Sequence, residues 1–262
     1  MSVDYGLAGK HALVSGGSHG IGQAIAVALA GQGCHVAICS RSESRLSATK
    51  KILSSSGIDA LTIAGDVLDP SSITEITDTI DRAWGGIDVL INNVGGGGRW
   101  GSAIVEETDI EVWNQVYQKN AGVAAAFTRW AIPEMRRRRW GRVVAVASIY
   151  GRQGGGRPWF TAAKSAQIAT MKTLAMTPYL ARDGITFNSV APGSIMIPET
   201  GWADERDRDP AAFQTRMNQE FPLGRLGTPD EVAATVLFLC SRQASLVNGA
   251  CITADGGESA AF

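Results

Sequence analysis

Ala12-Leu-Val-Ser-Gly-Gly-Ser-His-Gly-Ile-Gly22 is a buried-strand pattern that breaks into glycines and then opens a helical segment. Gly16, Gly20 and Gly22 allow a tight turn and a close approach of the backbone to a ligand. The free N–H groups and positive end of the following helix can then receive a pyrophosphate. The spacing, Gly-x-x-x-Gly-x-Gly, differs from the commonest dinucleotide fingerprint, so residues further along the chain must support the nucleotide hypothesis.

The bulk properties of the chain exclude several classes of protein. It has 262 residues, with 24 Lys and Arg against 25 Asp and Glu, a balance that favours neither nucleic acid nor an anionic membrane as a partner. Four cysteines without metal-ligand spacing predict reduced, buried thiols and no metal site. No apolar run approaches the ~20 residues that span a bilayer, and residues 1–10 do not read as a secretory signal. We expect a cytoplasmic protein with one domain, residues 1–262, that binds a dinucleotide and carries the catalytic residues.

Strand and helix patterns alternate along the whole chain. Short apolar runs predict seven strands, at residues 10–15, 35–40, 60–65, 89–95, 142–148, 185–190 and 250–253. Helical patterns lie between them, at residues 21–31, 45–55, 70–84, 111–135, 161–180, 211–220 and 229–239, with an irregular polar stretch at 198–209. The basic run at 136–139 ends a helix, where hydrated cations complement the helix dipole. The order predicts an α/β fold, a single doubly wound Rossmann domain with a seven-stranded parallel sheet.

Ligands of such a sheet bind beyond the carboxyl ends of its strands, so the residues there decide the ligand. Ser40-Arg41 follows the second strand, where an NAD-binding protein usually carries an acidic residue for the ribose hydroxyl. An arginine there can clamp a 2′-phosphate, which favours NADP; the alternative is an ordinary surface arginine. Asp66-Val67 follows the third strand, at the adenine end of a nucleotide. Asn92-Asn93-Val94-Gly95 places small and amide groups against its middle.

Taken together, these pieces resemble the short-chain dehydrogenase/reductase family over the whole chain, and within it the NADP-linked ketone and 3-oxoacyl reductases most. The matching pieces are Ser15-Gly-Gly-Ser-His-Gly-Ile-Gly22, Asp66-Val67, Asn92-Asn-Val-Gly95, Asn120, Ser148, Lys164 and Ala191-Pro-Gly193 with Ile195. The resemblance implies hydride transfer between NADPH and a small carbonyl or alcohol substrate, in a homotetramer or homodimer. It assigns coenzyme binding to Ser15, Gly16, Ser18, His19, Gly20, Ile21, Gly22, Ser40, Arg41, Asp66, Val67, Asn93, Gly95, Lys164, Pro192, Gly193 and Ile195.

The resemblance also assigns catalytic positions, and one of them departs from the family pattern. Ser148 would hydrogen-bond the substrate carbonyl, Asn120 would support a proton-relaying water, and Lys164 would hold the nicotinamide ribose and lower the pKa of a tyrosine four residues before it. Phe160 stands where that tyrosine, the proton donor, is expected. Either the residue was changed deliberately to trap a complex, or the protein lost or rerouted the chemistry. Tyr150 is the alternative donor; its other interpretation is a wall of the pocket.

The substrate end of the site is less determined. Ile197 stands where the family usually places a threonine that binds the nicotinamide amide. Six residues are expected around the pocket: Arg99, Trp100, Arg152, Gln153, Trp159 and Trp202. Their rings favour an apolar or ring-shaped substrate and their arginines a carboxylate or phosphate, while subunit packing explains them equally well. Residues 198–220 are expected to form a mobile lid. The sequence thus predicts an NADPH-dependent carbonyl reductase impaired by Phe160, with a non-catalytic NADP-binding regulator or scaffold as the alternative.

Overall fold

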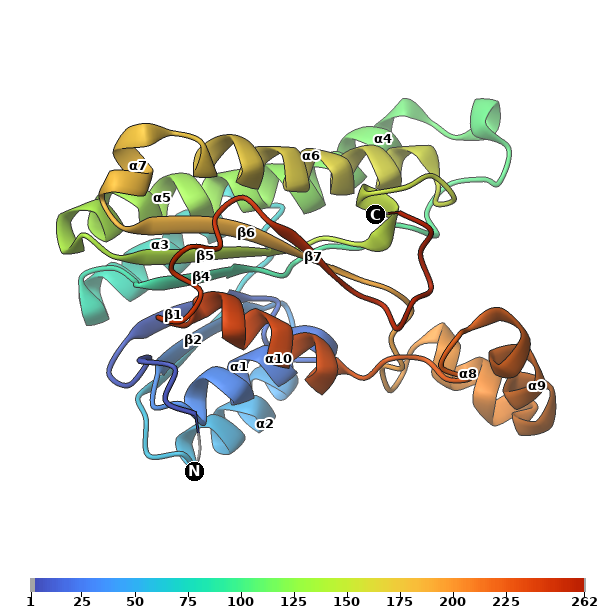
Figure 1. Ribbon diagram of the computed structural model, residues 1–262, viewed down its shortest axis with the longest axis horizontal. Coiled ribbons are helices and arrows are strands. Elements are labelled where there is room, and N and C mark those ends of the chain that lie inside the picture. Colours follow the sequence, from blue (N-terminus) through green and yellow to red (C-terminus); the bar gives the residue numbers. More distant parts are fainter. Residues whose placement is uncertain (1–2, 262) are drawn as a thin grey trace.

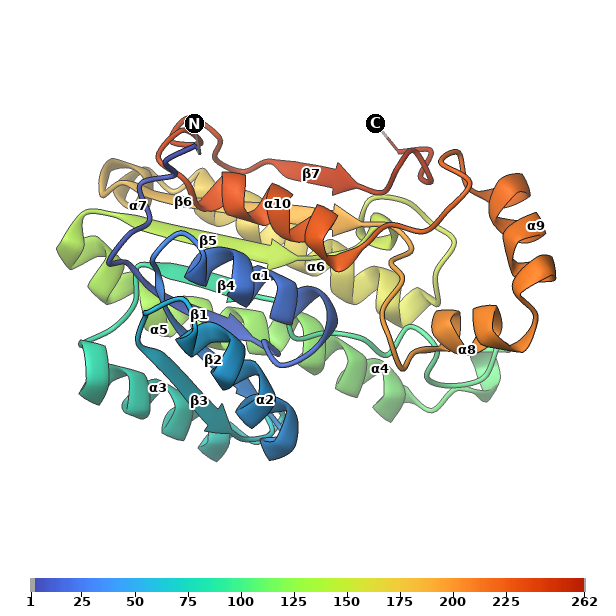
Figure 2. The same ribbon diagram turned by 90° about the horizontal axis from the view of Figure 1, so that it is seen from below.

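The computed structural model describes residues 3–261, in which seven strands form one sheet. The strands are β1 (His11–Ser15), β2 (His35–Ser40), β3 (Ala60–Ala64), β4 (Val89–Asn92), β5 (Gly141–Val146), β6 (Ile185–Pro192) and β7 (Cys251–Ala254). Their order is β3-β2-β1-β4-β5-β6-β7, and every neighbouring pair is parallel. The predicted seven-stranded parallel sheet is confirmed. All carboxyl ends therefore meet at one edge, to the right in Figure 2.

Helices cover both faces of the sheet (Figure 1). One face carries α1 (Gly20–Ala30), α2 (Glu43–Ser54) and α10 (Pro229–Cys240); the other carries α3 (Pro70–Trp84), α5 (Val123–Arg138), α6 (Pro158–Ala175) and α7 (Pro178–Arg182). The sheet separates two apolar cores, and alternate residues of a strand point into one or the other. In β1, Ala12 and Val14 pack on the α1 side, whereas Leu13 packs on the α5 side. This two-sided burial explains why the strands read as continuous apolar runs.

Local signals set several helix boundaries. Asp69 caps α3 by accepting a hydrogen bond from the Ser71 N–H (2.9 Å), Pro70 occupies the first turn, and Gly85 ends the helix in the left-handed conformation (φ 64°). Thr228 and Glu231 form a reciprocal capping box at the start of α10. Such caps each contribute about 1 kcal/mol to helix stability.

Three predicted segments differ from the structure. The helix expected at 161–180 is split into α6 and α7, because Pro178 lacks an N–H and restricts the residue before it. The helix expected at 111–135 runs from α4 (Ile110–Tyr117) through a π-helical turn (Gln118–Gly122) into α5. The irregular stretch expected at 198–209 contains a helix, α8 (Gly201–Arg208), which precedes α9 (Pro210–Glu220).

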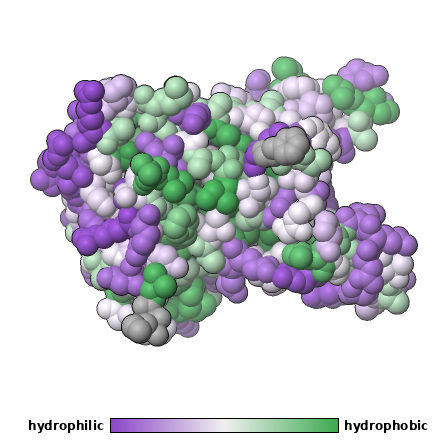
Figure 3. Space-filling view, in the orientation of Figure 1, coloured by the Kyte–Doolittle hydropathy of each residue, from purple (hydrophilic) through white to green (hydrophobic). Residues whose placement is uncertain are grey.

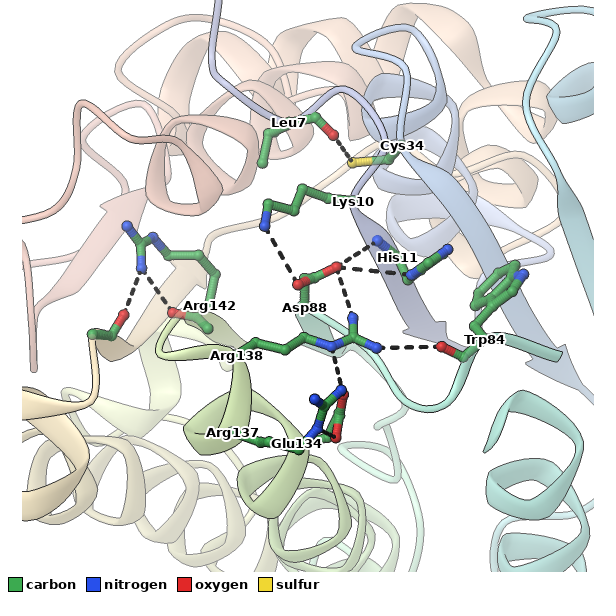
Figure 4. Close-up of polar contacts among 12 residues, drawn as sticks. Leu7, Lys10, His11, Cys34, Trp84, Asp88, Glu134, Arg137, Arg138 and Arg142 are labelled. Carbon is green, nitrogen blue, oxygen red and sulfur yellow. Dashed lines mark hydrogen bonds and ion pairs between the residues drawn. The ribbon is translucent and has the colours of Figure 1, made fainter. Parts of the chain in front are cut away.

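A buried ion cluster stabilises the sheet at the edge opposite the carboxyl ends (Figure 4). The Asp88 carboxylate, almost fully buried, accepts the His11 N–H (3.0 Å) and pairs with Arg138 (3.1 Å) and Lys10 (3.5 Å). Arg138 also binds Glu134 (2.7 Å), whose carboxyl pKa is lowered to about 2, chiefly by the hydrogen bond from Arg137. The run at 136–139 is therefore only partly the hydrated helix end that was expected, since Arg138 ties α5 to the sheet.

Other features concern the cysteines, metals and membranes. Cys34, Cys39 and Cys240 are buried free thiols, Cys251 is a half-buried free thiol, and burial raises the pKa of each. Within residues 3–261, no cluster of three potential metal ligands occurs. In the same described range, no helix combines the length and apolarity needed to cross a membrane.

Candidate active site

The glycine-rich loop between β1 and α1 has the geometry that the sequence predicts. Gly16 (φ 66°) and Gly20 (φ 54°) both adopt the left-handed conformation that favours glycine. A β-carbon on Gly22 would lie 2.3 Å from the Gly16 carbonyl oxygen, so only glycine fits there. The first turn of α1 carries no acidic side chain, which leaves its positive end available to an anion.

Ser15 and Asn93 hold this loop against β4. The Ser15 hydroxyl donates to the Ile91 carbonyl (3.2 Å) and accepts the N–H groups of Asn93 (3.0 Å) and Val94 (3.1 Å). The Asn93 amide donates in return to the Ser15 carbonyl (2.9 Å). Ser15 is buried with its hydroxyl fully used inside the protein, so it supports the loop from behind.

A cavity of about 370 Å³ lies at the carboxyl ends of β1, β2, β3 and β4. We call it the coenzyme cleft. Its lining includes eight residues expected from the sequence, namely Gly16, His19, Ser40, Arg41, Asp66, Val67, Asn93 and Gly95. Arg41 is largely exposed and lies 3.9 Å from the Asp66 carboxylate, a loose contact that leaves the guanidinium accessible.

Lys119 also lines the coenzyme cleft, and the sequence reasoning missed it. Its ammonium sits 4.6 Å from the centre of the Trp100 ring. Burial, and then the positive charge of Arg41, lower the pKa of Lys119. Two cations thus face a cleft to which the end of β2 contributes no carboxylate. Lys119 lies in the π-helical turn, which the sequence did not predict.

The structure places the remaining coenzyme residues expected from the sequence outside the lining of the cleft. The Ser18 hydroxyl donates to the Ser40 hydroxyl (2.8 Å), Ile21 and Gly22 belong to the first turn of α1, and Pro192 ends β6. Gly193 donates its N–H to Ala254 (3.2 Å), and Ile195 pairs with Gly227 in an isolated parallel bridge. The Ile197 side chain packs against the end of the glycine-rich loop, since a β-carbon on Gly20 would lie 3.0 Å from it.

Lys164 projects from α6 into the protein and is almost fully buried. Its Nζ donates to the Val146 carbonyl (3.0 Å) and to the Gln167 side-chain oxygen (2.9 Å). Desolvation lowers the pKa of Lys164 to about 7. The amine can therefore exchange a proton near neutral pH, a property that suits acid–base chemistry.

Asn120 lies in the π-helical turn, a type of helix irregularity that is frequent at functional sites. Its side chain accepts the Gly96 N–H (3.1 Å) and donates to the carbonyls of Gly96 (2.9 Å) and Val116 (2.8 Å). A β-carbon on Gly95 would lie 2.7 Å from Asn120 Oδ1 and 2.9 Å from Lys164 Nζ. The fold thus brings Gly95, Asn120 and Lys164 together at the end of β4.

Ser148, Tyr150 and Phe160 lie near the second cavity of the site. Ser148 follows β5, and its hydroxyl oxygen accepts the Tyr150 N–H (3.2 Å), which leaves its O–H free to donate. Phe160 lies on α6, and its ring centre is 5.8 Å from Lys164 Nζ. A cavity of about 520 Å³, here called the substrate cavity, is lined in part by Arg99, Tyr150, Arg157, Phe160, Ser194 and Trp202. Figure 3 shows the molecule hollowed on this side, between the loop before α4 and the α8–α9 pair.

The structure places the six pocket residues expected from the sequence in different parts of the molecule. Arg99 and Trp202 line the substrate cavity, whereas Trp100 lines the coenzyme cleft. Trp159 is a correction: it is buried and packs edge-on against Trp113, with ring centres 5.4 Å apart. The other two contact the carboxyl-terminal region, since Arg152 donates to Thr253 and Gln153 accepts the Ala260 N–H (2.8 Å).

The helices α8 and α9 lie together at one end of the molecule (Figure 1), and they share a small apolar core. Trp202 packs edge-on against Phe213 and Phe221, with ring centres 6.5 and 6.1 Å away. The guanidinium of Arg216 covers the Trp202 ring at 5.0 Å and binds Glu205 (2.7 Å). The predicted irregular lid is therefore a packed helical pair at the rim of the substrate cavity.

Comparisons with known proteins agree along the whole chain. A family model described as enoyl-(acyl carrier protein) reductase matches residues 16–259. A protein named as a ketoacyl reductase of the monensin polyketide synthase, from Streptomyces virginiae, is 36% identical, over 94% of this chain and 95% of that protein. The 3-oxoacyl-(acyl-carrier-protein) reductase of Aquifex aeolicus is 33% identical, over 96% of this chain and 98% of its own length. L-sorbose reductase from Gluconobacter frateurii, solved with NADPH and L-sorbose, superposes with a TM-score of 0.90 at 30% identity, over 99% of this chain and 100% of that one.

Proposed function

Because the chain belongs to the short-chain dehydrogenase/reductase family, we propose that it is an NADPH-dependent carbonyl reductase and alcohol dehydrogenase with phenylalanine at the proton-donor position. The observation that carries the proposal is the position of the buried Lys164 amine, which lies beside Gly95 of the coenzyme cleft and 5.8 Å from the centre of the Phe160 ring in the wall of the substrate cavity. Ser148 follows the end of β5, and Asn120 lies in the π-helical turn beside Gly95. The similar reductases, which act on 3-oxoacyl and ketose carbonyls, support a small ketone as substrate.

The choice of NADPH rests on charge. Arg41 and Lys119 both line the coenzyme cleft, and no carboxylate at the end of β2 repels a phosphate. A guanidinium can bind a 2′-phosphate in bidentate fashion, while an ammonium adds a point charge. The glycine loop and the positive end of α1 would hold the pyrophosphate. The residues present therefore fit NADPH.

The chemistry divides between the coenzyme and the residues of this chain. When bound, NADPH supplies the hydride that reduces the substrate carbonyl. The Ser148 O–H can donate a hydrogen bond to the carbonyl oxygen and so stabilise the negative charge that develops there. The Lys164 amine can exchange a proton near neutral pH, whereas the Phe160 side chain has no proton to donate. The missing step is protonation of the alkoxide, and loss of a general acid typically costs about 10²- to 10⁴-fold in rate.

Tyr150 is the candidate for an alternative proton donor. It lines the same cavity as Phe160, two residues after Ser148. Its place in the cavity wall supports both interpretations made from the sequence, a substitute donor and a structural wall. The variant Tyr150→Phe separates them, because it removes only the hydroxyl.

The alternative function is a non-catalytic NADP-binding regulator or scaffold. Phe160 favours it, because it removes the expected donor. The presence of Ser148, Asn120 and the buried Lys164 favours the reductase. Burial of a lysine lowers the stability of the fold, and a scaffold would have no use for it.

Coenzyme binding and turnover together test the proposed function. We expect NADPH to bind with a fluorescence change and the parent protein to reduce a ketose such as L-sorbose, a simple ketone or a 3-oxoacyl thioester slowly, with product confirmed by mass spectrometry. Lys164→Met is the matched control and should abolish this slow turnover. NADPH binding without product on any substrate would support the scaffold, and absence of NADPH binding would refute both functions.

Assembly, lid and location follow from the same proposal. We propose a homotetramer or homodimer, supported by exposed apolar residues on the α4 side, Ile110 and Tyr117. The single sheet that contains all seven strands supports one domain, and the placement of α8–α9 at the rim supports a lid. The cytoplasmic location remains a prediction. Light scattering that reports a monomer at micromolar concentration would refute the oligomer.

A further inference from the structure

Gln167 forms a direct link between two residues of the site. Its side-chain oxygen accepts a hydrogen bond from Lys164 Nζ (2.9 Å), and its side-chain nitrogen donates to the backbone carbonyl of Asn120 (3.1 Å). Gln167 is one turn after Lys164 on α6, and its side chain is fully enclosed. The link therefore joins α6 to the π-helical turn inside the protein.

The chemistry of the two ends fixes the orientation of the amide. A lysine amine presents N–H donors to the protein, and a backbone carbonyl can only accept. The oxygen of Gln167 must therefore face Lys164, and its NH₂ group must face Asn120. Leucine would supply neither group, and an ionised glutamate would lose the donor to Asn120 while adding a charge beside the amine. Glutamine alone among these satisfies both ends without a charge.

The link leaves one direction open for the lysine. An ammonium has three N–H groups, of which Val146 and Gln167 accept two. Nζ also borders Gly95, since a β-carbon on Gly95 would lie 2.9 Å from it, and Gly95 lines the coenzyme cleft. The two internal acceptors thus direct the remaining proton, or the lone pair of the neutral amine, toward the coenzyme.

We propose that Gln167 is a positioning residue whose side-chain amide ties Lys164 to the backbone of Asn120 and fixes the direction in which the lysine presents its remaining N–H group to the coenzyme cleft. This role rests on the proposed function for its purpose, but the link itself can be tested without coenzyme. Removal of the acceptor destabilises the charged amine, whereas a carboxylate in its place stabilises it.

The test is a titration of Lys164 by NMR in protein labelled with [¹³Cε]lysine, without NADPH. The chain has only six lysines, and the signal that disappears in Lys164→Met assigns the residue. We compare the parent with Gln167→Leu, Gln167→Glu and the control Thr170→Val, whose hydroxyl bonds only the backbone of its own helix (2.8 Å to Ala166). The same variants are titrated with NADPH, and their pH–rate profiles are measured in the Phe160→Tyr background.

We expect the pKa of Lys164 to fall by about one unit in Gln167→Leu, which removes the acceptor, and to rise by about one unit in Gln167→Glu, which adds a negative charge beside the amine. The pH–rate profiles should move in the same two directions, and Thr170→Val should move neither. If one Gln167 variant does not fold, the sign of the Lys164 pKa shift in the other variant still tests the proposal. An unchanged titration in a folded variant overturns the positioning role, even if NADPH binds and turnover proceeds. Opposite shifts without NADPH binding uphold it and refute the proposed function instead.

Discussion

The amine of Lys164 lies 5.8 Å from the centre of the Phe160 ring, which precedes it by one turn on α6. A phenol at position 160 would lie beside this amine, and the positive charge of the protonated amine would lower the pKa of the phenol. The ring of Phe160 keeps the packing against Gly98 but has no proton to give. Under the proposed function, the site therefore lacks the hydroxyl group of a proton donor at position 160.

Coenzyme choice is tested at Arg41. Arg41→Asp should weaken NADPH binding by about 10- to 100-fold and change NADH binding little, because hydrogen bonds to charged groups contribute about 1.5–3 kcal/mol. Fluorescence titration with both reduced coenzymes measures the effect. Arg82→Asp, an equal charge change at an exposed site on α3, is the control. Equal affinity of the parent for NADPH and NADH would contradict the assignment.

The buried lysine predicts a specific dependence of stability on pH. The pKa of Lys164 is about 7 in the folded protein and ordinarily 10.5, so between these values the unfolded chain binds more protons than the folded one. The free energy of unfolding must therefore rise with pH in this window and stay flat below it, as far as Lys164 contributes. We expect the parent-minus-variant difference for Lys164→Met to grow from pH 7 to about 10 in chemical denaturation. A constant difference would show that Lys164 titrates normally.

Gly95 is predicted to tolerate no side chain. In Gly95→Ala the new methyl group meets Asn120 Oδ1 at 2.7 Å and Lys164 Nζ at 2.9 Å, so both must shift. We expect a loss of about 1–3 kcal/mol in the free energy of unfolding, together with weaker NADPH binding. Gly154→Ala is the matched control, since its methyl group would meet no atom within 4 Å. Equal stability of the two variants would contradict the close packing of the site.

The α8–α9 pair is predicted to loosen without its tryptophan. Trp202→Ala removes the ring against which Phe213, Phe221 and Arg216 pack. Hydrogen exchange should accelerate across residues 201–220 and remain unchanged in the strands, because locally cohesive segments open independently of the main core. Tyr179→Ala, at an exposed ring on α7, controls for the loss of an aromatic surface. Exchange that rises equally in the strands would show that the pair has no separate stability.

The sequence predicted the sheet well because each strand is buried on both faces and therefore carries an unbroken apolar pattern. It predicted the start of α3 equally well, since Asp69 and Pro70 act locally. It missed α8 because polar residues 201–208 bury little beyond Ala203, and the packing of Trp202 depends on α9. The break before α7 was not predicted, although Pro178 is a local signal for it.

The site shows the same division. The glycine-rich loop, Arg41 and the set of Asn120, Ser148 and Lys164 could be identified from motifs at fixed spacing. Lys119 and Gln167 could not be predicted, because a π-helical turn and a contact between α6 and that turn bring them into place. Trp159 was misplaced because its position next to Phe160 in the sequence does not show where its side chain points. It is buried against Trp113, in a cluster on which Phe160 also packs, and it does not line the substrate cavity.

The most direct measurement of the central claim is the NADPH-dependent turnover of Phe160→Tyr against the parent, on the same panel of ketones, ketoses and 3-oxoacyl thioesters. A restored general acid should raise kcat by about 10²- to 10⁴-fold on at least one substrate. Tyr150→Phe in the parent serves as the companion variant and should leave the slow turnover unchanged. A Phe160→Tyr protein that is no faster on any substrate, while Tyr150→Phe silences an active parent, would contradict the role assigned to position 160.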